Sequence, residues 1–197
     1  MAETFYATLA EVKTSLGLPS AADTAKDALI TALLPQALDA INKFIGRDLR
    51  STAYTEYVDG TGKSYFYPKH YPIISVSSIG DDYDHATSTA KANLGTTEYL
   101  IYNDTGKIAL DPQGHATIGA FCSTPQGIKI VYTAGYATIP RDIAYVFSEL
   151  VGLWTGLKTR TIIMGDGSVV EGIKAPTGII PKELQAILQP YVKVKMA

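Results

Sequence analysis

The sequence predicts an α+β fold in which a bundle of about four helices, two N-terminal and two C-terminal, carries a central antiparallel β-rich insertion. Apolar residues recur with helical spacing at both ends of the chain, whereas residues 54–133 are rich in Tyr, Val, Ile, Thr and turn residues. Helices and strands are grouped instead of alternating, which argues against a parallel-sheet nucleotide fold. We expect helical parts at 6–50 and 138–192, within a single domain of residues 1–197.

The composition indicates a globular chain with little net charge. Hydrophobic residues make up 46% of the 197 and charged residues 18%. The 17 basic and 19 acidic residues leave no basic surplus of the kind that grips nucleic-acid phosphates. The single cysteine, Cys122, excludes an internal disulfide and a cysteine-based zinc site. The sequence shows neither a signal-peptide pattern nor the roughly 18 continuous apolar residues of a membrane span, so we expect a soluble protein made in a cytoplasm.

Two helices are predicted in the N-terminal part. Thr8 and Glu11 have the spacing of a capping box, and the short helix that they begin should end near Gly17. A weaker capping box precedes a longer helix at about 24–45, whose apolar residues recur every three or four positions. Pro35 lies inside this helix and should kink or divide it, because proline removes one backbone hydrogen bond.

The middle of the chain predicts strands joined by turns. Residues 54–58 and 64–67 flank a Gly-containing turn and are predicted to pair as a hairpin. Residues 99–102 and 107–110 are predicted to form a second hairpin in the same way. The remaining segments are predicted as a strand at 73–79, loops at 81–97 and 111–126, and a strand at 127–133.

The C-terminal part returns to helix. A helix is predicted at about 140–158, with Pro140 in the first turn, where proline is favoured. Residues 161–178 contain four glycines and are too long for an ordinary connection, so we expect this segment to be mobile or to be ordered by a partner. A last helix should start at Pro181 and end at Pro190.

Residues 60–64 (GTGKS) have the ending of a phosphate-binding loop. The full pattern needs a glycine five residues before Gly62, where the chain has Tyr57, and a helix after the loop, where strand-forming residues follow. A hairpin turn is the preferred interpretation, with nucleotide binding as the alternative.

The sequence shows no assembled catalytic or metal site. His70, His85 and His115 are far apart in the chain, although a triad can still form in three dimensions, so a hydrolase that uses one of them is an alternative. The acidic run at 81–84 lacks the spacing of a calcium loop and is expected to be a solvated loop. We therefore predict no enzymatic activity, no metal and no cofactor.

Tyrosine is abundant, with 13 residues against 5 phenylalanines. Tyr is favoured in strands and is also enriched in interfaces, so its abundance has two explanations. The second explanation predicts an alternative function, a monomeric binding module that recognises a peptide or a carbohydrate through its Tyr-rich β region.

Six stretches, taken in order, resemble the head–tail connector family of tailed bacteriophages, whose members are also called head-completion or adaptor proteins. The most telling stretch runs from residue 131 to 143 and leads into the helix that contains Trp154. Together the stretches span nearly the whole chain, apart from 81–125: residues 8–17, 41–47, 57–62, 71–76, 131–143 and 180–191.

The resemblance implies a structural virion protein that forms a ring of about a dozen identical subunits. Such a ring lies beneath the portal at one capsid vertex and joins the capsid to the tail. The implied partners are further copies of the chain, the portal protein, the next tail-completion protein and DNA that passes through the channel without sequence-specific binding; a membrane is not among them. The implied location is the head–tail junction of the virion, reached after assembly in the host cytoplasm. The resemblance implies neither an enzymatic activity nor a cofactor.

The candidate interface residues lie at and after the end of the second long helix. Both long apolar helices, at about 24–45 and 140–158, offer more hydrophobic surface than one small bundle needs. The candidate contacts with other subunits or the portal are Trp154, Lys158, Arg160, Ile162, Ile163, Met164, Val169 and Val170. The candidate contacts with DNA in the channel are Lys158, Arg160 and Lys174.

Overall fold

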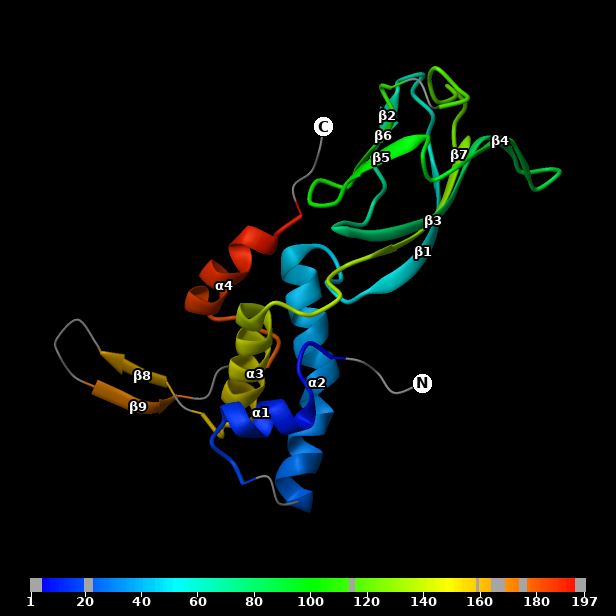
Figure 1. Ribbon diagram of the computed structural model, residues 1–197. Coiled ribbons are helices and arrows are strands. Elements are labelled where there is room, and N and C mark those ends of the chain that lie inside the picture. Colours follow the sequence, from blue (N-terminus) through cyan, green and yellow to red (C-terminus); the bar gives the residue numbers. More distant parts are fainter. Residues whose placement is uncertain are drawn as a thin grey trace. The chain divides into compact units, whose positions relative to one another are not determined.

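The structure, a computed structural model of the chain, describes residues 5–19, 23–113, 116–158, 160–163, 169–173 and 177–193. The chain divides into two compact units. Residues 1–49 and 138–197 form the helical unit, and residues 50–137 form the β unit (Figure 1). The described part is mixed α+β, with four α-helices and antiparallel sheets, as the sequence predicts.

The first helix, α1 (Leu9–Ser15), begins with the predicted capping box. The Glu11 N–H donates to Thr8 Oγ1 at 3.3 Å, and the Thr8 N–H donates to Glu11 Oε2 at 2.7 Å. These bonds satisfy backbone donors that the first turn of a helix leaves unpaired. The helix ends before Gly17, which has a φ of 67°.

The second helix, α2 (Thr24–Ile45), continues through Pro35, so of the two expected effects of this proline, a kink or a division, the division does not occur. Asp23 caps its N-terminus by accepting from the Lys26 N–H at 3.2 Å, and Gly46, with a φ of 76°, ends it. The reason for its continuity is that one buried stripe extends on both sides of Pro35: Ile30, Leu34, Ala37, Leu38, Ile41 and Ile45.

The third helix, α3 (Arg141–Thr155), is the most deeply buried element of the helical unit. It packs against α1, α2 and the last helix, α4 (Lys182–Leu188). Pro140 is the residue before its first turn instead of a member of it. A short 3₁₀ helix, η1 (Gln189–Tyr191), follows α4 and contains Pro190, and the Tyr191 hydroxyl donates to Asp142 Oδ2 at 2.7 Å.

An antiparallel strand pair lies between α3 and α4, in the segment that the sequence leads us to expect to be mobile or ordered by a partner. Its strands are β8 (Arg160–Ile163) and β9 (Val169–Ile173), with Ile162 opposite Val170 and Ile163 opposite Val169. The physical reason is that runs of β-branched residues stand on either side of Gly165 and Gly167 in the sequence, which is a hairpin pattern.

The β unit contains two antiparallel sheets. The larger has the order β1-β7-β3-β4 and the smaller has the order β2-β6-β5. The strands of the larger sheet are β1 (Thr52–Val58), β3 (Ile73–Asp84), β4 (Thr89–Leu94) and β7 (Ile128–Ala134). Those of the smaller sheet are β2 (Tyr65–Phe66), β5 (Tyr99–Tyr102) and β6 (Lys107–Leu110). The predicted hairpin of 99–102 with 107–110 and the predicted strand at 127–133 are thereby confirmed.

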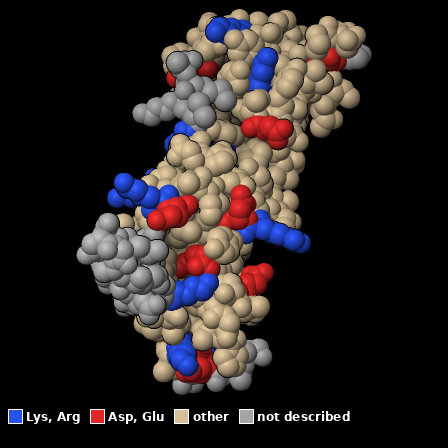
Figure 2. Space-filling model, turned by 90° about the vertical axis from the view of Figure 1, so that its left-hand side faces the viewer, with Lys and Arg blue, Asp and Glu red and all other residues tan. Residues whose placement is uncertain are grey.

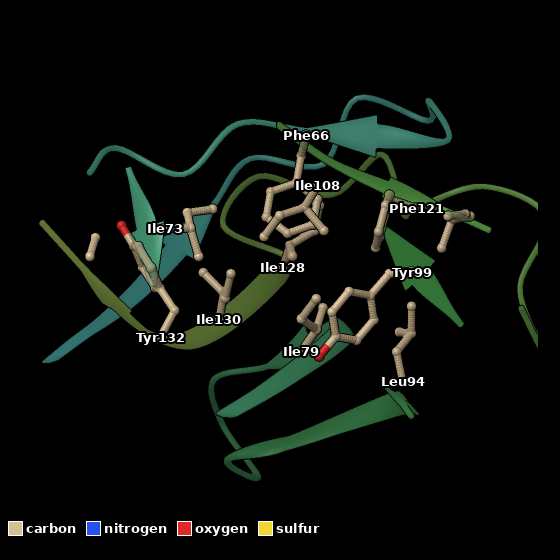
Figure 3. Packing of buried hydrophobic residues seen from close by; sticks show 12 residues of the cluster. Phe66, Ile73, Ile79, Leu94, Tyr99, Ile108, Phe121, Ile128, Ile130 and Tyr132 are labelled. Atoms are coloured by element: carbon tan, nitrogen blue, oxygen red, sulfur yellow. The ribbon is translucent and has the colours of Figure 1, made fainter. Parts of the chain in front are cut away.

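A hydrophobic core joins the two sheets (Figure 3). Ile128, Ile130 and Tyr132 alternate along β7 and are fully buried, because successive side chains of a strand point to opposite faces. Phe66 and Ile108, from the smaller sheet, lie in the same cluster. The edge-to-face contact of Phe66 with Phe121, at 4.8 Å between ring centroids, also belongs to this core.

The predicted hairpin of 54–58 with 64–67 is wrong, because the two strands belong to different sheets. β1 pairs with β7, and β2 pairs with β6. The connecting residues bond instead to the segment around Cys122: the Gly60 N–H donates to Thr124 O at 2.9 Å and the Gly62 N–H donates to Cys122 O at 3.0 Å. Gly60 is required by close approach, since a Cβ there would lie 2.2 Å from Cys122 O.

The predicted loop at 81–97 is also wrong. β3 continues to Asp84 and pairs with β4, with Asp81 opposite Ala92 and Tyr83 opposite Ala90. The polar composition of this segment makes it look like a loop in the sequence. Strand pairing, however, uses the backbone N–H and C=O groups, which polar residues carry as well as apolar ones.

Candidate interaction surfaces

The histidines lie in two separate clusters of the β unit, and His115 lies outside the described residues. His70 Nε2 is 3.2 Å from Glu56 Oε1, and its ring stacks on Tyr54 with 3.9 Å between centroids. His85 lies against Tyr57 and Tyr83. Within the described residues, no group of three or more His, Cys, Asp or Glu side chains is placed to hold a metal ion.

The GTGKS segment has a structural explanation. Gly60 allows the backbone to pass beside Cys122, Gly62 has a φ of 69°, and strand β2 follows the segment instead of a helix. Lys63 Nζ lies 5.6 Å from the centroid of the Tyr65 ring. The geometry therefore lacks the helix N-terminus on which a phosphate-binding loop depends.

The acidic run at 81–84 supports the fold. Asp81 is buried and accepts from the Cys122 N–H at 2.9 Å. Asp82 pairs with Lys91, whose hydrogen bond holds the pKa of that carboxyl below its usual value. Asp84 accepts from the Ala86 N–H at 2.8 Å, which lowers its pKa in the same way. The expectation of a purely solvated loop is corrected by these contacts.

The end of α3 is built around Trp154. Its side chain is only 1% exposed, and its indole N–H donates to Ile179 O at 3.3 Å. Lys158 follows the helix, and its N–H donates to Gly152 O at 2.9 Å while its ammonium group pairs with Glu149. The Trp154 side chain is therefore part of the core of the helical unit.

The hairpin β8–β9 brings together most of the candidate contacts that follow α3. Met164 and Lys174 lie outside the described residues, whereas five others lie on the paired strands: Arg160, Ile162, Ile163, Val169 and Val170. The sequence predicts these residues as a group but not their pairing. The signal that identifies the pairing is the pair of β-branched runs on either side of Gly165 and Gly167.

The helical unit exposes an apolar surface along the first half of α2, which we call the α2 outer face and define as Ala25, Ala28, Leu29 and Ala32. Leu29 is 44% exposed. With 100° per residue, this face lies opposite the buried stripe of the helix. Within the described residues, α2 is the one helix long and apolar enough to cross a membrane, and only 33% of its apolar window is buried; a core helix of a soluble protein meets the same criterion.

The β unit exposes aromatic residues beside lysines. On the smaller sheet, Lys107 Nζ lies 4.7 Å from the Tyr65 centroid and 5.2 Å from that of Tyr102, which is 49% exposed. Tyr67 and Leu100 are also exposed. On the face shown in Figure 2, basic and acidic side chains are mixed among uncharged ones. This view therefore shows no continuous basic surface of the kind that nucleic-acid binding needs.

In the part of the chain that the structure describes, the acidic run at 81–84 stabilises the fold, and the α2 outer face and the smaller sheet expose apolar and aromatic side chains. A family model described as "HCP: Head completion protein" matches residues 6–194. The chain therefore belongs to the head completion protein family.

Solved structures with a similar fold come from gene transfer agent (GTA) particles. One is described as the neck of an empty GTA particle computed with C6 symmetry, with 18% identity, a TM-score of 0.61 and coverage of 98% of this chain and 92% of that one. Another is the virion of a native GTA particle, with 17% identity, a TM-score of 0.59 and coverage of 100% and 95%. A third is the neck of a native GTA particle computed with C12 symmetry, with 16% identity, a TM-score of 0.56 and coverage of 96% and 90%. No curated protein matches the sequence.

Proposed function

We propose that this protein is a non-enzymatic subunit of a ring beneath the portal, where it joins the capsid to the tail. The observation that carries the proposal is the head completion family match over residues 6–194. The similar folds in neck structures computed with C6 and C12 symmetry support a ring of identical subunits. In this role the protein resides at the head–tail junction of the virion after assembly in the host cytoplasm, and it needs no cofactor.

The α2 outer face is the proposed contact with the next subunit. In a closed ring, one face of each subunit contacts a different face of the next subunit, so each subunit needs two different contact surfaces. The apolar stripe of α3 is buried inside the helical unit and is not available to another subunit, since Ile143, Val146 and Phe147 are fully buried. The first half of α2 retains apolar surface toward solvent, and covering it stabilises a ring through the hydrophobic effect.

The hairpin β8–β9 and Lys158 are the proposed contacts with the portal or a neighbouring subunit. They follow the end of α3 directly in the chain, and Arg160 and Lys174 add positive charge there. DNA passing through the ring would meet these cations without being read in sequence, because contacts with phosphates carry no base information. The next tail-completion protein is the remaining proposed partner.

The second candidate function is a binding module that recognises a peptide or a carbohydrate. The observations that favour it are two exposed tyrosines of the β unit: Tyr102 on the smaller sheet is 49% exposed, and Tyr67, which follows β2, is 41% exposed. Saturable binding of such a ligand by a monomer, together with failure to associate with the portal, would support this function over the ring.

The test of the ring uses two matched substitutions of exposed leucines. Leu29, on α2, is 44% exposed, and Leu100, on the smaller sheet, is 43% exposed. Leu29→Asp and Leu100→Asp should both leave the free chain folded, because surface substitutions usually change stability by no more than about 0.5 kcal/mol. With purified portal, we expect rings of wild type and Leu100→Asp in electron micrographs and native mass spectra, and few or none of Leu29→Asp. Ring formation by Leu29→Asp at the wild-type level would exclude the α2 contact, and absence of any portal complex with the wild type would exclude the function.

A further inference from the structure

The outer face of the larger sheet contains a cavity of about 400 Å³ to which the proposed ring assigns no role. The cavity is lined by residues of β3, β4, β7 and the turn that joins β3 to β4. Its charged lining residue is Lys129, and serine, threonine and asparagine side chains make up much of the rest.

The hollow follows from the register of the sheet. Tyr57, Lys129, Gly80 and Asn93 are consecutive partners across its four strands. Gly80 contributes no side chain to this row, and the Ala90 methyl group lies only 2.8 Å from the place where a Cβ on Gly80 would stand. Gly80 and Ala90 therefore form a low part of the lining between Lys129 and Asn93.

Lys129 is directed to this face by strand alternation, since its neighbours Ile128 and Ile130 are fully buried in the core. Its ammonium group donates to the Tyr83 hydroxyl at 3.3 Å. It also lies 4.7 Å from the Tyr83 centroid and 5.8 Å from that of Tyr57. In the described part of the chain, no carboxylate lies within ion-pair distance of this lysine. The fold therefore holds its charge in place with uncharged partners only.

The electrostatics at Tyr83 agree with an uncompensated cation. Burial by itself raises the pKa of a tyrosine, because it disfavours the charged form. Hydrogen bonds from Lys129, Tyr57 and Ser88 act in the opposite direction and prevail, so the pKa of Tyr83 is lowered. A positive potential of this kind also favours an anion placed in the cavity.

We infer that this cavity is a binding site for a carboxylate group. Lys129 Nζ supplies the charge, and the hydroxyl and amide groups of Ser78, Ser88 and Asn93 supply neutral donors around it. One cation balances the single charge of a carboxylate, whereas a phosphate is usually held by a fork of arginine donors or a cluster of backbone N–H groups. The carboxylate belongs either to a small organic acid or to an acidic side chain of a partner protein.

The test titrates the full chain with acetate, glutarate and an acetylated, amidated Gly-Glu-Gly peptide, and follows binding by calorimetry and by ¹H–¹⁵N spectra. We expect saturable binding that Lys129→Met weakens by about tenfold or more, the loss expected for a hydrogen bond to a charged group. Lys107→Met is the matched control, because Lys107 also lies over two tyrosine rings but does not line the cavity. Tighter binding of the peptide would indicate a protein source, and tighter binding of glutarate would indicate a small acid.

A second variant and a second readout keep the test independent of the folding of Lys129→Met. Ser78→Leu fills the cavity from an exposed position without removing a charge, and we expect it to abolish binding. A bound carboxylate should also raise the pKa of Tyr83 in the wild type, since a neighbouring anion disfavours tyrosinate. Absence of saturable binding, or an equal loss in Lys107→Met, would overturn the site. Either result leaves the ring proposal standing, because that proposal is tested on portal complexes.

Discussion

Single side chains in the helical unit show how burial redirects residues whose type suits an interface. Trp154 has the size and the polar N–H of an interface anchor, yet its ring lies in the core and its N–H bonds to Ile179 O. Tyr145, nine residues earlier on the same helix, is 51% exposed. Residue type therefore identifies the large apolar side chains of a helix. Packing determines which of them are buried in the core and which remain exposed for contact with another chain.

Trp154→Ala should lower the free energy of unfolding by about 3–5 kcal/mol, because it leaves a large cavity in the core. Urea unfolding followed by circular dichroism measures the change. Tyr145→Ala is the control on the same helix and should change stability by no more than about 0.5 kcal/mol. Similar losses in the two variants would contradict the burial difference between these residues.

Because of the buried Tyr132, we expect the free energy of unfolding to fall at alkaline pH. The Tyr132 hydroxyl is buried and accepts a hydrogen bond from the backbone N–H of His70 at 3.1 Å. Burial raises the pKa of Tyr132 well above the usual value. A raised pKa in the folded state means that its stabilising contribution is complete below the unfolded pKa of about 10 and is lost as the pH rises above it. The loss should approach about 1.4 kcal/mol per pH unit.

Tyr132→Phe should flatten this decline, measured by urea unfolding between neutral pH and pH 11. The variant should also lose about 1 kcal/mol at neutral pH, because the His70 N–H loses its acceptor. Tyr145→Phe, at an exposed position, should leave the slope unchanged. An unchanged slope in Tyr132→Phe would mean that other groups cause the alkaline loss.

Among the elements, the helices and the tight hairpin β5–β6 agree with the sequence, whereas the other strand pairings do not, including the short-range hairpins β3–β4 and β8–β9. The capping box of α1 and the hairpin β5–β6 involve residues a few positions apart, and both are correctly predicted. β1 pairs with β7, which is the last strand of the β unit along the chain, whereas the sequence suggests that residues 54–58 pair with the nearby residues 64–67. Alternation identifies which face of a strand is buried but is the same for every partner, so it cannot select one.

Gly60 is the residue on which the crossing between the two sheets depends. Gly60→Ala should destabilise the protein by about 1–3 kcal/mol or more, because the new Cβ would meet the backbone of Cys122, which cannot move aside. Thermal unfolding followed by circular dichroism measures the effect. Gly119→Ala is the matched control, since a Cβ there meets nothing within 4 Å, and it should be close to neutral. Equal stability of the two variants would contradict the close approach at Gly60.

At the scale of the whole molecule, the β unit is an insertion whose ends meet. Arg50 and Tyr136 form an isolated parallel bridge, so the chain enters and leaves the unit at neighbouring positions. The unit has its own hydrophobic core, formed by strands of both sheets. These two features are those of a part that folds by itself.

A fragment of residues 50–137 should therefore fold alone and unfold in one cooperative transition. Circular dichroism and dispersed ¹H–¹⁵N spectra of the fragment check this expectation, with the spectrum of the full chain as the reference. Phe66→Ala in the fragment should abolish the transition, because Phe66 is part of the core cluster. A disordered wild-type fragment would mean that the β unit depends on the helical unit.

The sequence by itself determines what depends on neighbours along the chain: the helix starts and stops, the apolar stripes, the β-rich middle and the family resemblance. It also indicates which residues form the candidate site after α3. The tertiary structure alone decides which strands pair, that the apolar stripe of α3 is buried inside the helical unit while the first half of α2 faces solvent, and that a cavity forms beside Lys129 on the larger sheet. The physical reason is that helix signals act within a few residues, whereas sheet pairing and burial depend on contacts between segments that only the folded chain brings together.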